Sequence, residues 1–210
     1  MNIKKIFELQ LSNLLEKYRA KNEPLAKSGF FLFEDFEENE LLFIGINPSD
    51  VTGYNVPLTN GIYWGSETFM NAHPYYKPFP SLSNGKWSHL DLFFTLEKDQ
   101  SKIKEAIEAE NLFLGEQIEI STAIIHKLEP TIIVVCNAFA SGLIKDVFQC
   151  NFDDTIGTYR IKDFINIPIF FSGMITGQRS LDVGSRERLK WHIGFVKEAL
   201  GQEIHTDKKL

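Results

Sequence analysis

Apolar residues recur at helical spacing in four stretches of the chain. Positions three and four apart lie on one face of a helix, so this spacing predicts amphipathic helices. The expected helices cover residues 3–20, 101–127 and 138–148 and a last segment that carries Leu189, Ile193, Val196 and Leu200. We expect the second helix to break near Gly115 and Ser185 to cap the last one, since serine is a favoured N-terminal cap.

Four shorter apolar runs have the character of strands. A continuous run of about four to eight apolar residues, without alternation, is typical of a strand covered on both faces of a parallel sheet. These runs lie at 41–46, 89–95, 131–136 and 167–172, and a further short run lies at 30–33.

Strands that alternate with helices predict parallel pairing through right-handed crossovers. The expected fold class is therefore α/β, a three-layer α/β/α sandwich around a central, mainly parallel four-stranded sheet. We expect a single domain over residues 1–200, in which 1–40 form the N-terminal helix and a connection and 41–200 form the core. A polar tail is expected at 201–210.

Ligands in such sheets collect at the carboxyl ends of the strands. The residues expected there are Asn47, those around Asp91, Asn137 and the segment 172–179. The long segment 50–86 has no periodicity but is rich in aromatic residues, which predicts a functional loop rather than a disordered one.

Composition and motifs exclude several classes of protein. The chain has 210 residues, a net charge of −6 and two cysteines. Two cysteines cannot supply a disulfide framework or an iron–sulfur cluster, and the histidines lack metal-ligand spacing. The P-loop, the dinucleotide-binding glycine pattern and the nucleophile elbow are missing from the sequence. We therefore expect neither a metal nor a cofactor, and we expect Cys136 and Cys150 to be buried free thiols.

The charge distribution bears on partners. No apolar run approaches the roughly 20 residues of a membrane span, and the first residues do not resemble a signal peptide. We expect a cytoplasmic monomer without a membrane partner. The net negative charge is atypical of a dedicated nucleic-acid binder. Acids are nevertheless absent from residues 68–90, and four basic residues face two acids in residues 179–192.

Two of the predicted strand ends carry compact motifs. In Gly45-Ile46-Asn47-Pro48-Ser49, the glycine permits close approach of a ligand, and the Asn-Pro turn projects the amide from the sheet edge. The segment from Ser172 to Arg179 combines small residues, hydroxyls and an arginine, which suits a loop that grips a phosphate or enters a groove. Each motif by itself is more simply an ordinary turn.

Together and in this order, these segments resemble the uracil-DNA glycosylase superfamily. The first motif is similar to the Gly-Ile-Asn-Pro-Gly motif of the mismatch-specific uracil/thymine glycosylase branch, with Ser49 in the last place. Residues 89–95 resemble the second strand of the family, residues 130–140 its third strand and following helix, and residues 172–179 its second motif. In order and topology, the resemblance extends over about residues 41–200. Residue identities match only at the first motif.

The resemblance implies an enzyme that hydrolyses the N-glycosidic bond of a flipped, damaged or mismatched base in DNA. Asn47 would be the catalytic residue and would orient the attacking water through its side-chain carbonyl. The implied base-binding residues, of which one aromatic would stack on the base, are Gly45, Ile46, Tyr63, Trp64, Phe69 and Asp91. The implied DNA-contacting residues are Ser49, Ser172, Gly173, Thr176, Gln178 and Arg179.

The chain departs from the best-known branch of the family, which has Asp in the first motif and His in the second. Here Asn47 occupies the first position and residues 172–179 contain no histidine, as in the mismatch-specific branch. Asp91 falls where several branches place an Asn that reads uracil. An ionised carboxylate only accepts hydrogen bonds and would repel uracil O4, so uracil is not the base we expect to be preferred. A local cap or salt bridge is the other role open to Asp91.

Two further classes of function stay open. The same fold could be a non-catalytic module that binds nucleobases or nucleic acid, which the acidic balance and the missing histidine favour. An unrelated α/β protein could use Asn47 only as a turn residue. Asn47 and the basic segments favour the enzyme.

Overall fold

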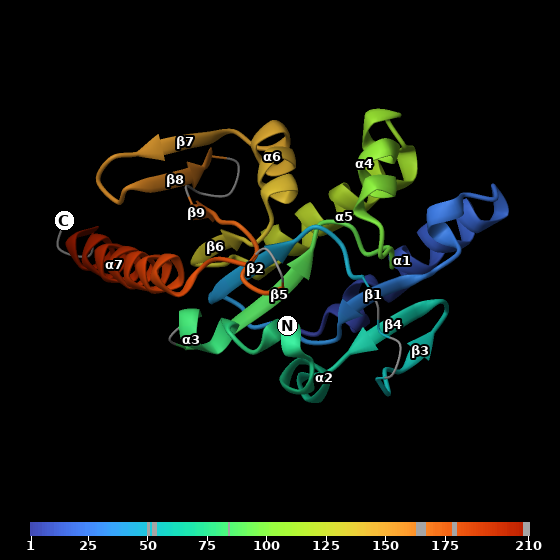
Figure 1. Cartoon of the computed structure of the whole chain (residues 1–210), viewed down its shortest axis with the longest axis horizontal. Coiled ribbons are helices and arrows are strands. Elements are labelled where there is room, and N and C mark those ends of the chain that lie inside the picture. The colour runs from blue at the N-terminus through green and yellow to red at the C-terminus, as the bar shows by residue number, and fades with distance from the viewer. Residues whose placement is uncertain (50, 52–53, 84, 163–166, 178–179, 208–210) are drawn as a thin grey trace. The chain divides into compact units, whose positions relative to one another are not determined.

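The computed structural model describes residues 1–49, 51, 54–83, 85–162, 167–177 and 180–207, without the side chains of 202–207 (Figure 1). Its contacts divide the chain into two compact units, each made of separate stretches, whereas the sequence predicted one domain over 1–200. The first unit contains residues 1–38, 45–74 and 89–128. The second contains residues 39–44, 75–88 and 129–210.

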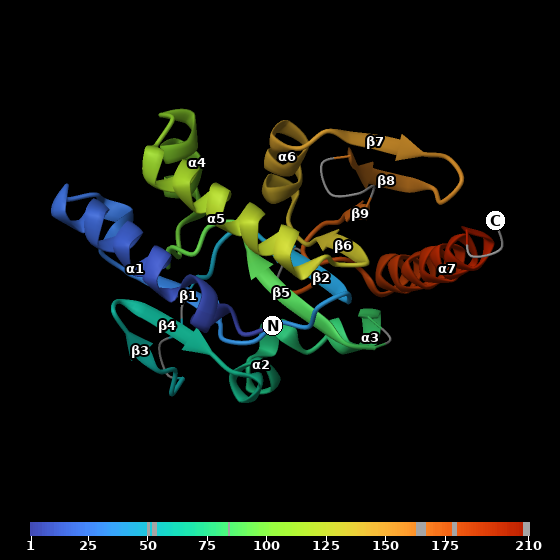
Figure 2. The same cartoon turned by 180° about the vertical axis from the view of Figure 1, so that it is seen from behind.

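The first unit combines helices with a small sheet (Figure 2). Its elements are α1 (Ile3–Ala20), η1 (Pro24–Ala26), β1 (Phe30–Phe33), β3 (Leu58–Thr59), β4 (Ile62–Gly65), α2 (Glu67–Ala72), α4 (Gln100–Glu108) and α5 (Leu112–Leu128). The strand order is β1-β4-β3, with β1 parallel and β3 antiparallel to β4. Since β4 and α2 lie within residues 50–86, that segment is not the irregular loop that its lack of periodicity predicted.

The predicted first helix is confirmed with its boundaries as α1. Asn2 caps it by accepting a hydrogen bond from the backbone N–H of Lys5. Its apolar face is buried, and the hydroxyl of Tyr18 donates to Glu116 of α5 over 2.7 Å. Burial and this carboxylate together raise the pKa of Tyr18 to about 12.

The second unit contains most of the larger sheet. Its elements are β2 (Leu41–Gly45), η2 (Pro74–Tyr76), α3 (Phe79–Ser83), β5 (Trp87–Asp91), β6 (Ile132–Val135), α6 (Ala138–Val147), β7 (Cys150–Asp153), β8 (Thr158–Ile161), β9 (Ile167–Phe171) and α7 (Val183–Asp207). The carboxyl ends of β2 and β5, which are Gly45 and residues 89–91, are counted with the first unit, as is Pro74.

The larger sheet is mainly parallel and has six strands in the order β5-β2-β6-β9-β8-β7, flanked by helices. The α/β class and the strands predicted at 41–46, 131–136 and 167–172 are confirmed, and β2, β6 and β9 pair in parallel. The strand predicted at 89–95 overlaps β5 only at residues 89–91, because β5 begins at Trp87 and ends at Asp91. The prediction of four strands was wrong in number, because the antiparallel hairpin β7–β8 extends the sheet beyond β9. Its first strand reads Cys-Asn-Phe-Asp and is not fully buried, so it lacks the apolar run that marked the other strands.

Two predicted helix boundaries were wrong. The break in residues 101–127 lies at 109–111, because Glu110 adopts a left-handed φ of 52° and the side chain of Asn111 accepts the N–H of Phe113. Gly115 lies inside α5. At the last helix, the cap is Asp182 rather than Ser185, because the Asp182 carboxylate accepts the backbone N–H of Ser185; α7 continues to Asp207 through most of the predicted tail.

Two further findings bear on composition. Cys136 is buried as predicted, but Cys150 is only half-buried because it lies on the edge strand β7; no disulfide joins either cysteine within the described residues. Within the described residues, no helix combines the length and the apolar character needed to cross a membrane.

We expect Asn137→Ala to lower the free energy of unfolding by about 1 kcal/mol. Asn137 lies after β6, where the sequence placed a candidate ligand group. Its side-chain oxygen instead caps α6 by accepting the N–H groups of Phe139 and Ala140. Urea unfolding measures the change, and Asn137→Asp should retain most of the stability because the carboxylate accepts the same bonds. Equal losses in the two variants would contradict the cap.

Candidate functional site

The carboxyl ends of β2 and β5 bring two polar side chains against the backbone of Gly45. The carbonyl of Gly45 accepts the N–H of Leu92 over 3.1 Å. A Cβ on Gly45 would lie 2.1 Å from Oδ1 of Asp91 and 3.2 Å from Nε2 of His89. The carboxyl group and the imidazole therefore occupy the space that any other residue at position 45 would fill.

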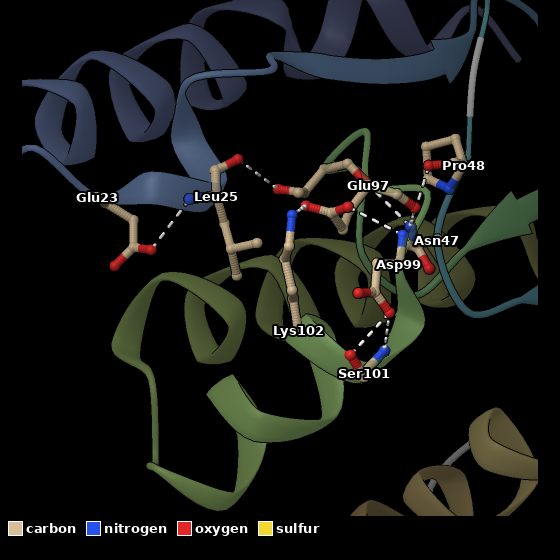
Figure 3. Close-up of polar contacts among 9 residues, drawn as sticks. Glu23, Leu25, Asn47, Pro48, Glu97, Asp99, Ser101 and Lys102 are labelled. Carbon is tan, nitrogen blue, oxygen red and sulfur yellow. Dashed lines mark hydrogen bonds and ion pairs between the residues drawn. The ribbon is translucent and has the colours of Figure 1, made fainter.

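Asn47 follows Gly45 by two residues and is almost completely buried. Its Nδ2 donates to the backbone carbonyls of Glu97, Pro48 and Thr95, over 2.7, 3.0 and 3.5 Å (Figure 3). Its Oδ1 is also buried and has no hydrogen-bond partner among the described residues. Turning the carboxamide over would place Oδ1 against carbonyl oxygens, so the surrounding acceptors determine its orientation.

Gln117 of α5 holds the segment that supplies these carbonyls. Its Oε1 accepts the N–H groups of Phe94 and Thr95, over 2.7 and 3.2 Å. Its Nε2 donates to Oγ1 of Thr95 and to the carbonyl of Phe113, over 3.3 and 3.2 Å. The side chain is completely buried and uses both of its polar atoms. Gln117 thus acts as a positioning residue for the acceptors around Asn47, and sequence reasoning missed it because glutamine is ordinary in an amphipathic helix.

Burial shifts the pKa values of both side chains over Gly45. The residue Asp91 keeps some exposure, but its carboxyl group is enclosed by protein, which raises its pKa to about 8. Burial lowers the pKa of His89 to about 3, and its ring lies edge-on to Phe33. Both groups are therefore mostly neutral at pH 7. The expectation that uracil is disfavoured assumed an ionised Asp91, and this assumption was wrong.

The aromatic candidates lie in the first unit, and two of them cannot stack on a ligand as they stand. Trp64 is completely buried in β4, and Phe69 is packed against Phe31. Tyr63 is half-buried on the same strand as Trp64. Tyr54, which was not among the candidates, is 36% exposed and lies edge-on to Phe69 with ring centroids 5.1 Å apart. It is more exposed than the three candidates, and its ring also contacts His73 with centroids 4.8 Å apart.

The remaining candidates divide between the units. Ile46 is buried and Ser49 is exposed, both in the first unit. Ser172, Gly173 and Thr176 are half-buried and follow β9 in the second unit, where the N–H of Ser172 donates to the carbonyl of Val135. Gln178 and Arg179 lie outside the described residues.

The second unit also contains a cavity of about 690 Å³ between α3 and α7. It is lined by apolar and charged side chains, including Leu82, Lys190, Trp191, Phe195 and Lys197. None of the candidate site residues predicted from the sequence is among the described residues that line it. In the described part of the chain, no group of three or more His, Cys, Asp or Glu residues is arranged to hold a metal ion.

Comparisons with protein-family models, with curated proteins and with solved structures found no match for this chain.

We expect Asp91→Asn to remove a pH-dependent part of the stability. The carboxyl group has a pKa of about 8 in the folded chain against an ordinary value of 3.8, so the folded state binds more protons between these values. The stabilising contribution of the neutral form is thus complete below about pH 4 and lost as pH rises to about 8. Urea unfolding at several pH values should show the variant gaining stability relative to the wild type as pH rises.

Asp146→Asn makes the same substitution at an exposed position and provides the matched control. Parallel pH profiles for Asp91→Asn and the wild type would contradict the raised pKa.

Proposed function

We propose that this chain is a uracil-DNA glycosylase-like enzyme that hydrolyses the N-glycosidic bond of a flipped damaged or mismatched base in DNA. The observation that carries the proposal is the orientation of Asn47: its N–H groups are directed to backbone carbonyls, and its buried Oδ1 is left without a partner among the described residues. A buried acceptor with no partner is costly unless a ligand or water uses it.

The proposed role of Asn47 follows from hydrogen-bond chemistry. Its Oδ1 would accept a hydrogen bond from the attacking water and direct the oxygen lone pair at C1′ of the sugar, and the proton that the water loses would pass to the departing base. An amide is a poor general base at neutral pH, so its contribution would be positioning, with the developing positive charge of the sugar driving the attack. The base would depart as an anion, stabilised by hydrogen bonds to its edge. Ser172, Gly173 and Thr176, in the second unit, are separate candidates for a phosphate contact.

Asp91 supplies a candidate group for reading the base. A neutral carboxyl offers one O–H donor and one carbonyl acceptor side by side. This pair complements a ring N–H next to a carbonyl, the edge that uracil, thymine, hypoxanthine and xanthine share. An ionised Asp91 would lose the donor and would repel the carbonyl. The proposed substrates are therefore bases with this edge, and uracil is among them.

The proposal includes the finer fold. The strands β5, β2, β6 and β9 would form the four-stranded sheet of a glycosylase-like α/β/α sandwich, and the hairpin β7–β8 would be an addition to it. The order of the four strands in the sheet is consistent with this assignment, because the chain passes from β2 to β5 on one side and then to β6 on the other. Asn47 directly follows the strand at which this reversal occurs, where ligands of open α/β sheets bind.

The second candidate function is a non-catalytic module that binds a nucleobase. A neutral Asp91 can pair with a base edge without any bond being cleaved, and the net charge of −6 opposes tight binding to DNA. Binding of free bases without excision would favour this function.

We expect Asn47→Ala to lower the single-turnover rate of base excision by about 100-fold or more. The assay uses oligonucleotides that contain uracil, thymine opposite guanine, hypoxanthine or xanthine, each in single and double strands. Asn55→Ala is the matched control, because Asn55 is exposed. Unchanged excision in Asn47→Ala would contradict the role of Asn47. Absence of excision by the wild type on every substrate would exclude the enzyme in favour of the binding module.

The raised pKa of Asp91 predicts a pH dependence of base recognition. Excision of uracil should fall as pH rises through about 8, because the carboxyl group loses its proton and with it the donor to O4. Asp91→Asn keeps a donor and an acceptor at every pH, so its excision rate should not show this fall. Identical pH profiles for the two proteins would contradict recognition by a neutral Asp91.

A further inference from the structure

The last helix, α7, carries apolar residues on two faces. Ile193 and Val196 are buried and hold one face against the rest of the second unit. Trp191 and Phe195 lie outside that face: they are 71% and 41% exposed, and their rings are stacked with centroids 5.8 Å apart. The packing of the unit does not require this exposed pair.

Helix α3 lies beside α7 (Figure 1), and Trp191 and Phe195 line the cavity of about 690 Å³ between them. Gly194 also lines the cavity. Apart from its chain neighbours and the helix backbone, a Cβ built on this glycine would meet no heavy atom within 4 Å. Lys197 joins the two helices by donating to the carbonyl of Ser83 over 2.9 Å. The lack of a side chain at position 194 therefore contributes to the hollow and permits close approach of another backbone.

Charged residues of opposite sign flank Gly194 symmetrically. Lys190 precedes it by four residues and Glu198 follows it by four, and both are exposed and line the cavity. Because a helix turns by about 100° and rises by about 1.5 Å per residue, each lies about 6 Å along the axis from Gly194 and about 40° to opposite sides of it. A two-fold rotation about an axis through Gly194 would therefore exchange a positive position for a negative one.

This arrangement makes the face complementary to itself. When two copies of α7 cross antiparallel at Gly194, Lys190 of each copy faces Glu198 of the other, which gives two ion pairs. The same symmetry places Trp191 of each copy against Lys197 of the other, within the cavity beside α3, where an ammonium group and an indole ring attract each other. An interface of this kind uses one surface patch twice, as in most symmetric dimers.

Other occupants fit the charges less well. A parallel pair of helices would place Lys190 against Lys190 and Glu198 against Glu198. A charged small ligand would find no net charge to select it, because the cavity is lined by two lysines and two glutamates.

We propose that this face of α7 binds a second copy of the chain, as an antiparallel two-fold pair of helices that cross at Gly194. The protein would then be a dimer in place of the monomer expected from the sequence. This inference does not rest on the proposed function.

Sedimentation equilibrium of the full chain over a range of concentrations measures the dissociation constant of the dimer. Lys190→Glu should raise this constant at least about tenfold, because each dimer then has like charges at two places. Glu198→Lys should raise it similarly for the same reason. Lys5→Glu is the matched control, since it makes the same change of charge at an exposed position of α1 and should leave the constant unchanged.

The decisive measurement mixes the two charge variants. One Lys190→Glu chain and one Glu198→Lys chain together have opposite charges at both places, so the mixture should form a dimer about as tight as the wild type. The two positions lie eight residues apart in one chain, about 12 Å along the helix, so a contact within a chain could not produce this recovery.

Trp191→Ala tests the aromatic contact. It should weaken the dimer at least about tenfold, because the truncation occurs twice in each dimer. The matched control is Leu112→Ala, which removes an apolar side chain of similar exposure (72%) from α5 and should leave the dimer unchanged.

A wild-type chain that stays monomeric at millimolar concentration would overturn the proposal. A dimer that neither charge variant weakens would also overturn it, as would a mixture no tighter than the separate variants, because the copies would then meet through another surface. None of these outcomes depends on base excision, so the failure of this inference and the failure of the proposed function are distinguishable.

Discussion

The carboxamide of Asn47, held by backbone carbonyls, is the interaction on which the candidate site depends. Buried N–H groups must be satisfied, and the carbonyls of Pro48 and Glu97 satisfy those of Asn47 from a direction that leaves Oδ1 without a partner among the described residues. Because the acceptors belong to the backbone, substitutions of side chains at these positions would leave them in place. Gln117 in turn fixes residues 94–95, because the oxygen and the nitrogen of its side-chain amide both form hydrogen bonds with them. One buried carboxamide thus supports the surroundings of another.

A second constraint is the lack of a side chain at Gly45. Because no side chain covers the backbone at Gly45, the carboxyl group of Asp91 and the imidazole of His89 can lie directly against it. Both groups are buried there, and burial disfavours their charged forms. Above about pH 4 and below about pH 8 both groups are mostly neutral, so the polar surface beside Asn47 offers hydrogen bonds without net charge. Such a surface suits the uncharged edge of a base better than a phosphate.

Particular elements show which sequence signals were reliable. The strands at 41–46 and 131–136 were predicted because their apolar runs are buried in the sheet, and their carboxyl ends were located correctly. The hairpin at 150–161 was missed, because a strand at a sheet edge keeps polar residues and has no run to detect. Trp64 was a candidate platform because it is an aromatic residue of the long segment 50–86 at suitable spacing, yet its strand lies within the smaller sheet, where the side chain is completely buried.

The sequence by itself determined the α/β class, the first helix, the main strands and the position of Gly45, Asn47 and Asp91 at strand ends. It could do so because continuous apolar runs and turn residues determine local structure through burial and backbone sterics, and such patterns can be recognised from residues that are neighbours in the sequence. Only the tertiary structure decided the direction of the Asn47 carboxamide, the neutral state of Asp91 and the exposure of Phe152. Each depends on groups far away in the chain: carbonyls about 50 residues later, enclosure by a neighbouring strand, and the edge of a sheet that a hairpin completes. Hydrogen-bond geometry and burial are properties of such long-range contacts, which residue spacing does not encode.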